Sequence, residues 1–204
     1  MAEKTVLLST AYLAPIAYYL QMKNHPQVII EKYCHYVKQT YRNRCYIASA
    51  NGVQTLSIPV VKPDAPKCFT KDIRIASHGN WQHLHWNAIV SAYNSTPFFA
   101  YYADDFRHFY EKHCTFLFDF NEELRVLVCS LLDIAPSLSY SSAYIAQISP
   151  DELDLRETIH PKKPICVGDF NPYYQVFKER YGFQPNLSII DLLFNMGPEA
   201  ILFL

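Results

Sequence analysis

An Asn-Gly pair in the first third of the chain is the feature that most restricts how this sequence can fold. Asn51 and Gly52 are the residues that a tight hairpin turn prefers, because its central positions need a positive φ. Apolar and β-branched residues flank the pair at 45–48 and at 53–61. The pattern therefore predicts a β-hairpin, with residues 42–48 as its first arm, and it predicts that the residues leading into that arm are extended.

The residues leading into the hairpin, Tyr36–Arg44, are called the basic segment here. They include Lys38, Arg42, Asn43 and Arg44 among two tyrosines. In an extended chain side chains alternate between faces, so the three cations would share one face and repel one another unless an anion lay opposite. Guanidinium forks suit phosphate or carboxylate groups. Two interpretations remain open: an anion-binding face, and an ordinary exposed strand face.

The rest of the chain predicts strands early, helices in the middle and a helix at the end. Ser188 and Asp191 fit a capping box at the start of the last helix, and Gly197 fits its end. We expect one α+β domain over residues 1–204, with a strand-rich first third, then helices, late strands and a C-terminal helix. The expected strands are 5–9, 28–31, 72–75, 140–145, 165–167 and 173–177, and the expected helices are 15–24, 81–94, 102–115, 122–133, 151–159 and 189–195.

Helical periodicity separates two histidines on the expected helix 81–94. Turning about 100° per residue from Trp81 places His83 on the polar side and His85 in the apolar arc with Trp81. We therefore expect a solvated His83 and a half-buried His85. A lone histidine on an apolar face is more often a satisfied core residue. The alternative is an acid/base group with a pKa tuned by its surroundings.

Composition argues against several classes of function. The formal net charge is −1, which lacks the positive field of a general nucleic-acid-binding protein. The five glycines lie too far apart for a phosphate-binding loop. The six cysteines form no Cys-x-x-Cys pair, so we expect no zinc site, no cofactor and reduced thiols in a cytoplasmic protein. No window is suited to a transmembrane helix or a signal peptide.

Several short motifs follow one another over nearly the whole chain. They are Lys38 with Arg42-Asn43-Arg44, Leu56–Val60, Asn80-Trp81, His85-Trp86, Ala92-Tyr93, Pro97-Phe98, Asp154-Leu155-Arg156, His160-Pro161-Lys162, Tyr174–Phe177 and Leu187–Pro198. The order of these motifs resembles the WbqC-like family of bacterial proteins. The resemblance implies a role in surface-polysaccharide or O-antigen biosynthesis, with transfer of an acyl or aminoacyl group, such as glycine, to an amino sugar.

The first hypothesis is a transferase acting on a nucleotide-linked amino sugar. In it, Lys38, Arg42 and Arg44 hold phosphates or a carboxylate, and His85 is the general base that deprotonates the attacking amine. Other residues complete the predicted site. Asn43 and Gln175 bind hydroxyl or amide groups, Trp81 stacks on a ring, and Arg156 and Lys162 add charge if they converge on the basic segment.

The second hypothesis is a non-catalytic sugar-nucleotide-binding or accessory protein in polysaccharide assembly, so catalysis itself is an open question. A concave pocket with a titratable group beside the cations would favour the enzyme, and a flat basic face would favour the binding protein. A metal-dependent hydrolase ranks last, because no two histidines on one predicted element share a face with a carboxylate at ligand spacing. The many tyrosines and phenylalanines are compatible with a dimer interface.

Overall fold

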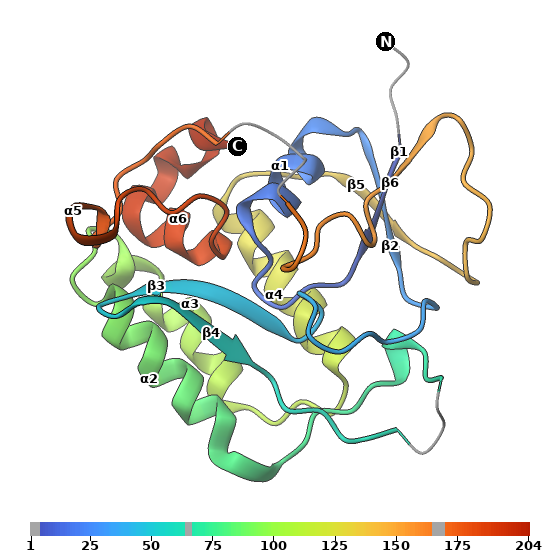
Figure 1. Ribbon diagram of the computed structural model, residues 1–204, viewed down its shortest axis with the longest axis horizontal. Helices are drawn as coiled ribbons and strands as arrows, with labels where there is room; N and C mark the ends of the chain where they lie inside the picture. The colour runs from blue at the N-terminus through green and yellow to red at the C-terminus, as the bar shows by residue number, and fades with distance from the viewer. Residues whose placement is uncertain (1–4, 64–66, 165–169) are drawn as a thin grey trace.

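The first two strands and the helix between them form a parallel βαβ unit, around which the rest of the chain folds. The computed structural model describes residues 5–63, 67–164 and 170–204 (Figure 1). β1 (Thr5–Ser9) leads into α1 (Ile16–Asn24), and the chain returns in β2 (Gln27–Glu31) parallel to β1. Parallel neighbours need a long crossover connection, and α1 supplies it.

Two short strands from late in the chain complete the sheet. β5 (Ser137–Tyr140) pairs with β2, and β6 (Glu152–Asp154) pairs with β1, so the order is β5-β2-β1-β6 and all pairs are parallel. Residues 6–8 of β1 have no exposed surface, as expected of a strand covered on both faces. Each such side chain contributes about 1.5–3 kcal/mol by its burial. The sheet thus joins the start of the chain to its last third.

The predicted hairpin is present as β3 (Arg44–Ser49) and β4 (Gly52–Ser57), which pair in antiparallel register. Its turn lies one residue earlier than expected, at residues 50–51, because Ser49 pairs with Gly52. The positive φ of 98° belongs to Gly52. In Figure 1 the hairpin runs from the side of the parallel sheet across α2 toward α5.

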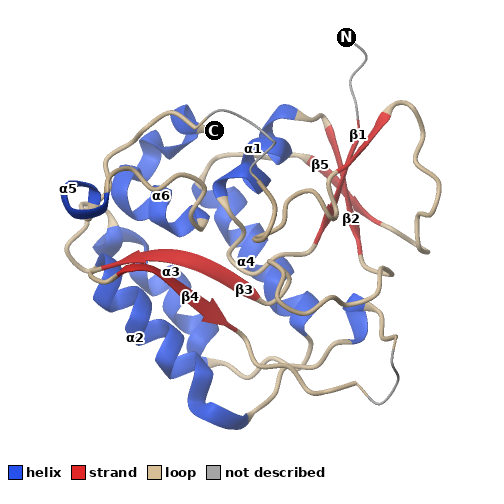
Figure 2. Ribbon diagram, in the orientation of Figure 1, coloured by secondary structure: helices blue, strands red, loops and turns tan. Residues whose placement is uncertain are grey.

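The helices lie beside the hairpin and beside one another (Figure 2). Aromatic rings contribute to the contacts between them. The Phe194 ring lies 5.2–5.5 Å from the rings of Tyr93, Phe99 and Phe106, which ties the C-terminal helix to two earlier ones. The helices are α2 (Trp81–Tyr93), α3 (Phe99–Glu111), α4 (Leu117–Leu131), α5 (Lys178–Tyr181) and α6 (Ile189–Met196), with 3-10 turns at Thr70–Asp72, His78–Asn80 and Gly197–Phe203.

The structure confirms the mixed class: early strands, central helices, late strands and a C-terminal helix. Three local predictions are wrong. Residues 151–159 contain β6 rather than a helix, because they pair with β1. Residues 173–177 form a loop, because Tyr173 and Gln175 turn inward to a buried carboxylate. Residues 72–75 make isolated bridges rather than a strand. The strand expected at 165–167 lies outside the described residues.

The starts of two helices also differ in detail. α4 begins at Leu117 rather than at residue 122, so Asn121 lies inside it, and the Asn121 side-chain amide donates to the Arg42 carbonyl over 2.8 Å. α6 begins after Ser188 as expected, but the Ser188 hydroxyl donates to the Leu13 carbonyl instead of capping the helix. Gly197 ends α6 with a φ of 57°, and a Cβ there would overlap the Phe98 ring.

Three properties follow directly from the described residues. None of the helices among them has both the length and the apolar character needed to cross a bilayer. No group of three or more His, Cys, Asp or Glu side chains within these ranges is arranged to hold a metal ion. Five cysteines are free thiols, and Cys166 lies outside the described ranges.

Candidate functional site

The basic segment is a loop that contacts the end of β1 through Arg42. The prediction that it is extended is wrong. Only Arg44 belongs to β3. Gln39 has a φ of 61°. The Thr40 hydroxyl donates to the Val37 carbonyl over 2.9 Å and accepts from the Arg42 backbone N–H. Such local side-chain bonds compete with a strand for the backbone groups, so the cations do not share one face.

Arg42 points into the protein rather than toward solvent. Its side chain is 2% exposed, and its Nη2 donates to the Ser9 hydroxyl over 2.8 Å and to a Glu157 carboxylate oxygen over 2.7 Å. Ser9 is the last residue of β1, and Glu157 follows β6. Arg42 therefore joins the basic segment to the carboxyl ends of two neighbouring strands.

The second basic segment, His160–Lys163, meets the first. The Lys162 ammonium donates to the Gln39 side-chain oxygen over 2.7 Å, and Arg42 forms its ion pair with Glu157 just upstream. The sequence left this convergence open, and the structure establishes it. The two segments come together because β6 lies beside β1 in the sheet.

Arg156 is also turned inward, and carboxylates already neutralise it. It is paired with Asp154 at 2.7 Å and with Glu31 at 3.3 Å, and Glu31 has no exposed surface. The hydrogen bond from Arg156 holds the pKa of Asp154 below its usual value. Glu31 further accepts from the Ser141 hydroxyl over 2.7 Å. Arg156 therefore ties the end of β6 to the ends of β2 and β5.

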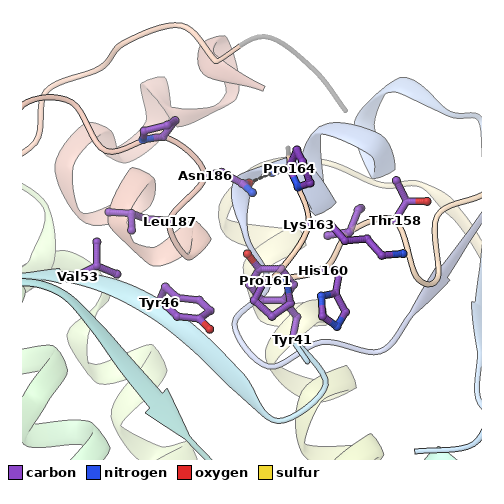
Figure 3. A pocket seen from close by; sticks show the side chains of 13 residues that line it. Tyr41, Tyr46, Val53, Thr158, His160, Pro161, Lys163, Pro164, Asn186 and Leu187 are labelled. Atoms are coloured by element: carbon purple, nitrogen blue, oxygen red, sulfur yellow. Dashed lines mark hydrogen bonds between the residues drawn. The ribbon is translucent and has the colours of Figure 1, made fainter. Parts of the chain in front are cut away.

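A cavity of about 430 Å³ opens where these segments meet (Figure 3). This volume is typical of small-molecule pockets. Its walls come from the basic segment, the hairpin, the chain after β6 and the loop before α6, and most of them are aromatic, proline or aliphatic. The lining residues, together called the cavity, are Ala17, Tyr41, Tyr46, Val53, Thr158, Ile159, His160, Pro161, Lys163, Pro164, Pro185, Asn186 and Leu187.

The polar groups of the cavity present mainly hydrogen-bond donors. The His160 Nδ1 accepts the Lys162 backbone N–H at 3.0 Å, so the proton of the neutral ring lies on Nε2. Burial, and then the charges of Lys163, Arg42 and Lys162, lower the pKa of His160 against the opposing effect of Glu157. The Asn186 side-chain oxygen accepts from the Ala17 N–H at the start of α1, which leaves its amide N–H₂ as a donor.

A smaller recess of about 10 Å³ lies at the carboxyl ends of β1 and β6. It shares Tyr41 and Ile159 with the cavity. Ligands of open parallel sheets bind outside the carboxyl ends of the strands, which is where both hollows lie. The lining residues, together called the recess, are Ser9, Thr10, Ala11, Tyr18, Thr40, Tyr41, Arg42, Leu155, Arg156 and Ile159.

His85 lies in the aromatic core, and it lines neither hollow. It is 6% exposed, so it is buried rather than half-buried. Its Nδ1 is 2.9 Å from the Tyr12 hydroxyl, which is 2.8 Å from the Tyr110 hydroxyl. Burial lowers the pKa of His85 to about 4, against the effect of a hydrogen bond to the Ser57 backbone. The general-base role of His85 stays a prediction.

Gln175 contributes to a buried network around Asp191. The Asp191 carboxylate has no exposed surface. It accepts from Tyr93 at 3.0 Å, from Tyr173 at 2.5 Å and from Gln175 at 2.8 Å. Burial raises the pKa of Asp191, although all three donors oppose this rise. The expected capping role of Asp191 is therefore replaced by a core hydrogen-bond network.

The remaining predicted residues are divided between surface and core. Lys38 is exposed beside Gln39. Asn43 donates to the Ile58 carbonyl over 3.0 Å, and the buried Arg44 Nε has no hydrogen-bond partner within the part of the chain that the structure describes. Trp81 is 7% exposed and lies edge-on to the His85 ring. Arg42, Arg156 and Lys162 thus gather at the sheet edge, whereas Trp81, His85 and Gln175 lie in the core.

Sequence reasoning did not single out several residues that line the two hollows or contact their walls. Tyr18 and Asn186 carry no local signal, because only the tertiary fold brings them to the site. Glu157 follows the noted Asp154-Leu155-Arg156 motif, and His160 opens the noted His160-Pro161-Lys162 motif. Glu157 and His160 could have been found by considering every polar residue in and next to each motif, and not only its cations.

Comparison with known proteins places this geometry in a family. The model of the WbqC-like protein family matches residues 10–160. This chain belongs to the WbqC-like protein family. The matched range includes Tyr41, Arg42, Arg156 and His160, whereas Asn186 lies beyond it. The WbqC-like match therefore covers the recess except for Ser9, and only part of the cavity wall.

A curated relative extends over the same length. The chain is 27% identical, over 224 aligned residues, to a protein of Mycobacterium tuberculosis (strain ATCC 25618 / H37Rv) named "Uncharacterized protein Rv1507c". The alignment covers 97% of this WbqC-like chain and 96% of the relative. No solved structure matches the chain significantly.

Proposed function

We propose that this WbqC-like protein is a transferase of bacterial surface-polysaccharide biosynthesis that moves an acyl or aminoacyl group to a nucleotide-linked amino sugar. The observation that supports this most is the concave cavity at the junction of the two basic segments, with the titratable His160 ring beside Lys163 in its wall. A flat basic face would have suited a partner surface better.

The sugar or base ring would lie against the tyrosines of the cavity. Tyr41 and Tyr46 line it with ring centroids 5.9 Å apart and nearly perpendicular, which offers both a ring face and a ring edge to a ligand. The His160 Nε2–H and the Asn186 amide would donate to ligand oxygens. These groups suit an uncharged polar ring better than a bare phosphate.

The phosphates of the nucleotide would lie at the rim. Arg42 and Arg156 are already paired with carboxylates, so they have little charge left to attract an anion. Lys38, Lys162 and Lys163 are exposed. The Lys162 and Lys163 ammonium groups donate to uncharged acceptors, the Gln39 side chain and the Glu157 carbonyl. Lysine binds phosphate as a mobile point charge, which suits a diphosphate that enters from solvent.

A non-catalytic sugar-nucleotide-binding protein is the second candidate, and the state of His160 favours it. Transfer to an amine requires a group that takes up its proton. The Lys162 backbone N–H occupies the His160 Nδ1, so the neutral ring offers the ligand a donor. If His85 is the base that the first hypothesis predicts, it must act from outside the cavity lining.

The decisive experiment measures binding and transfer on the same proteins. Thermal shift and calorimetry with nucleotide sugars, acyl-coenzyme A thioesters and amino acids would be followed by mass spectrometry of a nucleotide-linked amino sugar after incubation with each donor. Ligands that bind the folded state raise Tm by mass action. We expect a nucleotide sugar to raise Tm in the wild type and to bind at least tenfold more weakly to Tyr46→Ala.

Lys62→Ala is the matched control, because Lys62 is exposed and lines a separate hollow of about 320 Å³. It should bind the nucleotide sugar as the wild type does. A mass increase of the sugar would establish transfer. Binding with no donor consumed would support the second candidate, and equal binding by Tyr46→Ala and the wild type would refute the cavity as the site.

A further inference from the structure

Two buried hydrogen-bond donors of the recess have no partner among the described residues. Tyr18 is 3% exposed and Arg42 is 2% exposed. The Tyr18 hydroxyl and the Arg42 Nε form no hydrogen bond with any described residue, and both residues line the recess. A buried polar group without a partner costs roughly 1–3 kcal/mol, so folded proteins rarely leave one unoccupied.

The hydroxyl groups that line the recess do not accept a hydrogen bond from either donor. Ser9 donates its proton to the Arg156 carbonyl over 3.1 Å, and its oxygen already accepts from the Arg42 Nη2. Thr10 donates to a Glu122 carboxylate oxygen over 2.9 Å, and Thr40 donates to the Val37 carbonyl. None of these hydroxyl oxygens accepts from the Tyr18 hydroxyl or the Arg42 Nε, so the two donors of the recess have no acceptor among the described residues.

The size and charge of the recess restrict what that acceptor is. A volume of about 10 Å³ holds roughly one atom the size of a water oxygen. Three carboxylates, Asp154, Glu31 and Glu157, already pair with the two guanidinium groups beside the recess. A further negative charge would be buried against this excess of carboxylates, which is costly. The missing acceptor is thus one uncharged oxygen.

We propose that the recess binds the carbonyl oxygen of the acyl group on an N-acylated amino sugar. The Tyr18 hydroxyl and the Arg42 Nε–H donate to this oxygen, while the sugar ring lies in the cavity beyond the shared residues Tyr41 and Ile159. The inference rests on the proposed function and specifies that the site recognises the acylated product of the transfer. A carbonyl oxygen has two lone pairs and can accept from both donors at once.

Calorimetry with two nucleotide sugars tests this proposal. The probes are UDP-N-acetylglucosamine and UDP-glucose, and the proteins are the wild type, Tyr18→Phe and the control Tyr102→Phe. Tyr102 is a half-buried tyrosine of α3 that lines neither hollow. We expect the wild type and the control to prefer the N-acetyl sugar by about tenfold, and Tyr18→Phe to lose that preference.

Tyr18→Phe should also keep or raise the Tm of the free protein, because it removes a hydroxyl that has no protein partner. This result would separate loss of recognition from loss of folding. An unchanged preference in Tyr18→Phe, or no preference in the wild type, would overturn the recess proposal while leaving the transferase proposal intact.

If neither nucleotide sugar binds the wild type, the proposed function fails and a crystal soak decides the recess independently. Crystals of the full chain would be soaked in acetamide and in N-acetylglucosamine. A carbonyl oxygen within hydrogen-bonding distance of the Tyr18 hydroxyl and the Arg42 Nε supports the inference. A recess that contains only water in both soaks overturns it.

Discussion

The Lys162 ammonium donates a 2.7 Å hydrogen bond to the side-chain oxygen of Gln39, 123 positions earlier in the chain. Both residues are exposed, so the contact itself contributes little to stability. Its importance is positional, because it joins the two basic segments at the edge of the cavity. The same junction contains the Arg42–Glu157 ion pair, which differs in that one partner is buried.

Removing Glu157 should therefore destabilise the protein, because the buried Arg42 guanidinium would remain without a counter-charge. Arg42 is 2% exposed and the Glu157 side chain is 55% exposed. We expect Glu157→Ala to lower the free energy of unfolding by up to about 3 kcal/mol, because a buried guanidinium loses its counter-charge. Arg42→Met combined with Glu157→Ala should cost less than the sum of the two single changes. Urea denaturation of the four proteins measures this, and strict additivity would contradict it.

Asp191 should make stability depend on pH in the acidic range. Burial raises its pKa above the ordinary value of 3.8, so the folded state holds the proton more tightly than the unfolded state. The stability of the wild type relative to Asp191→Asn should be greatest below pH 3.8 and should fall as pH rises toward the folded pKa. Urea denaturation at a series of pH values checks the sign, and a relative stability that increases with pH would refute it.

His160 should make ligand binding weaken in acid. Its pKa lies below the usual 6.5 because of burial and the neighbouring charges of Lys163, Arg42 and Lys162, with Glu157 opposing. Protonation places a hydrogen on Nδ1, which then faces the Lys162 N–H. We expect nucleotide-sugar affinity to be constant above about pH 7 and to fall as His160 titrates, and we expect His160→Gln to remove this dependence. NMR titration of the ring and calorimetry across pH test both, and an identical pH profile in His160→Gln would count against the assignment.

His85→Ala separates a core role from catalysis. The side chain is buried and lies 2.9 Å from the Tyr12 hydroxyl. We expect its removal to lower the free energy of unfolding by about 2–4 kcal/mol, as for other large-to-small core changes, with nucleotide-sugar affinity kept wherever the variant is folded. His83→Ala, on the exposed side of α2, is the control and should change little. A normal Tm together with abolished transfer would instead establish the general base.

Sequence patterns within single segments predicted some elements well. β1 spans the expected residues 5–9, and α1 begins one residue later than the expected 15–24. α6 ends at Gly197 as expected. Pro150 after Ser149 is typical of a helix start and predicts a helix over residues 151–159. This prediction is wrong because pairing with β1 makes the residues of β6 extended. Parallel pairing between distant segments depends on tertiary packing, which periodicity does not encode.

The role of the candidate site stays a prediction, and the structure tests only where its residues lie. The density of cations points to the basic segment, which lines both hollows through Tyr41. The direction of Arg42 could not be predicted, because it depends on the turn at Thr40 and on Glu157, 115 positions away. His85 was correctly placed on the apolar side of its helix, but helical spacing alone does not distinguish a core histidine from a ligand-binding one.

The pairing of β1 with β6 also sets an order of events during synthesis. β1 spans Thr5–Ser9, and its neighbour β6 begins only at Glu152, so one edge of β1 stays unpaired while most of the chain is being translated. An unpaired apolar strand edge is prone to association with other chains. The cavity and the recess both need residues that follow β6, so a nascent chain cannot bind the ligand before this edge is covered. Ligand in the cell would therefore stabilise only chains whose sheet is complete.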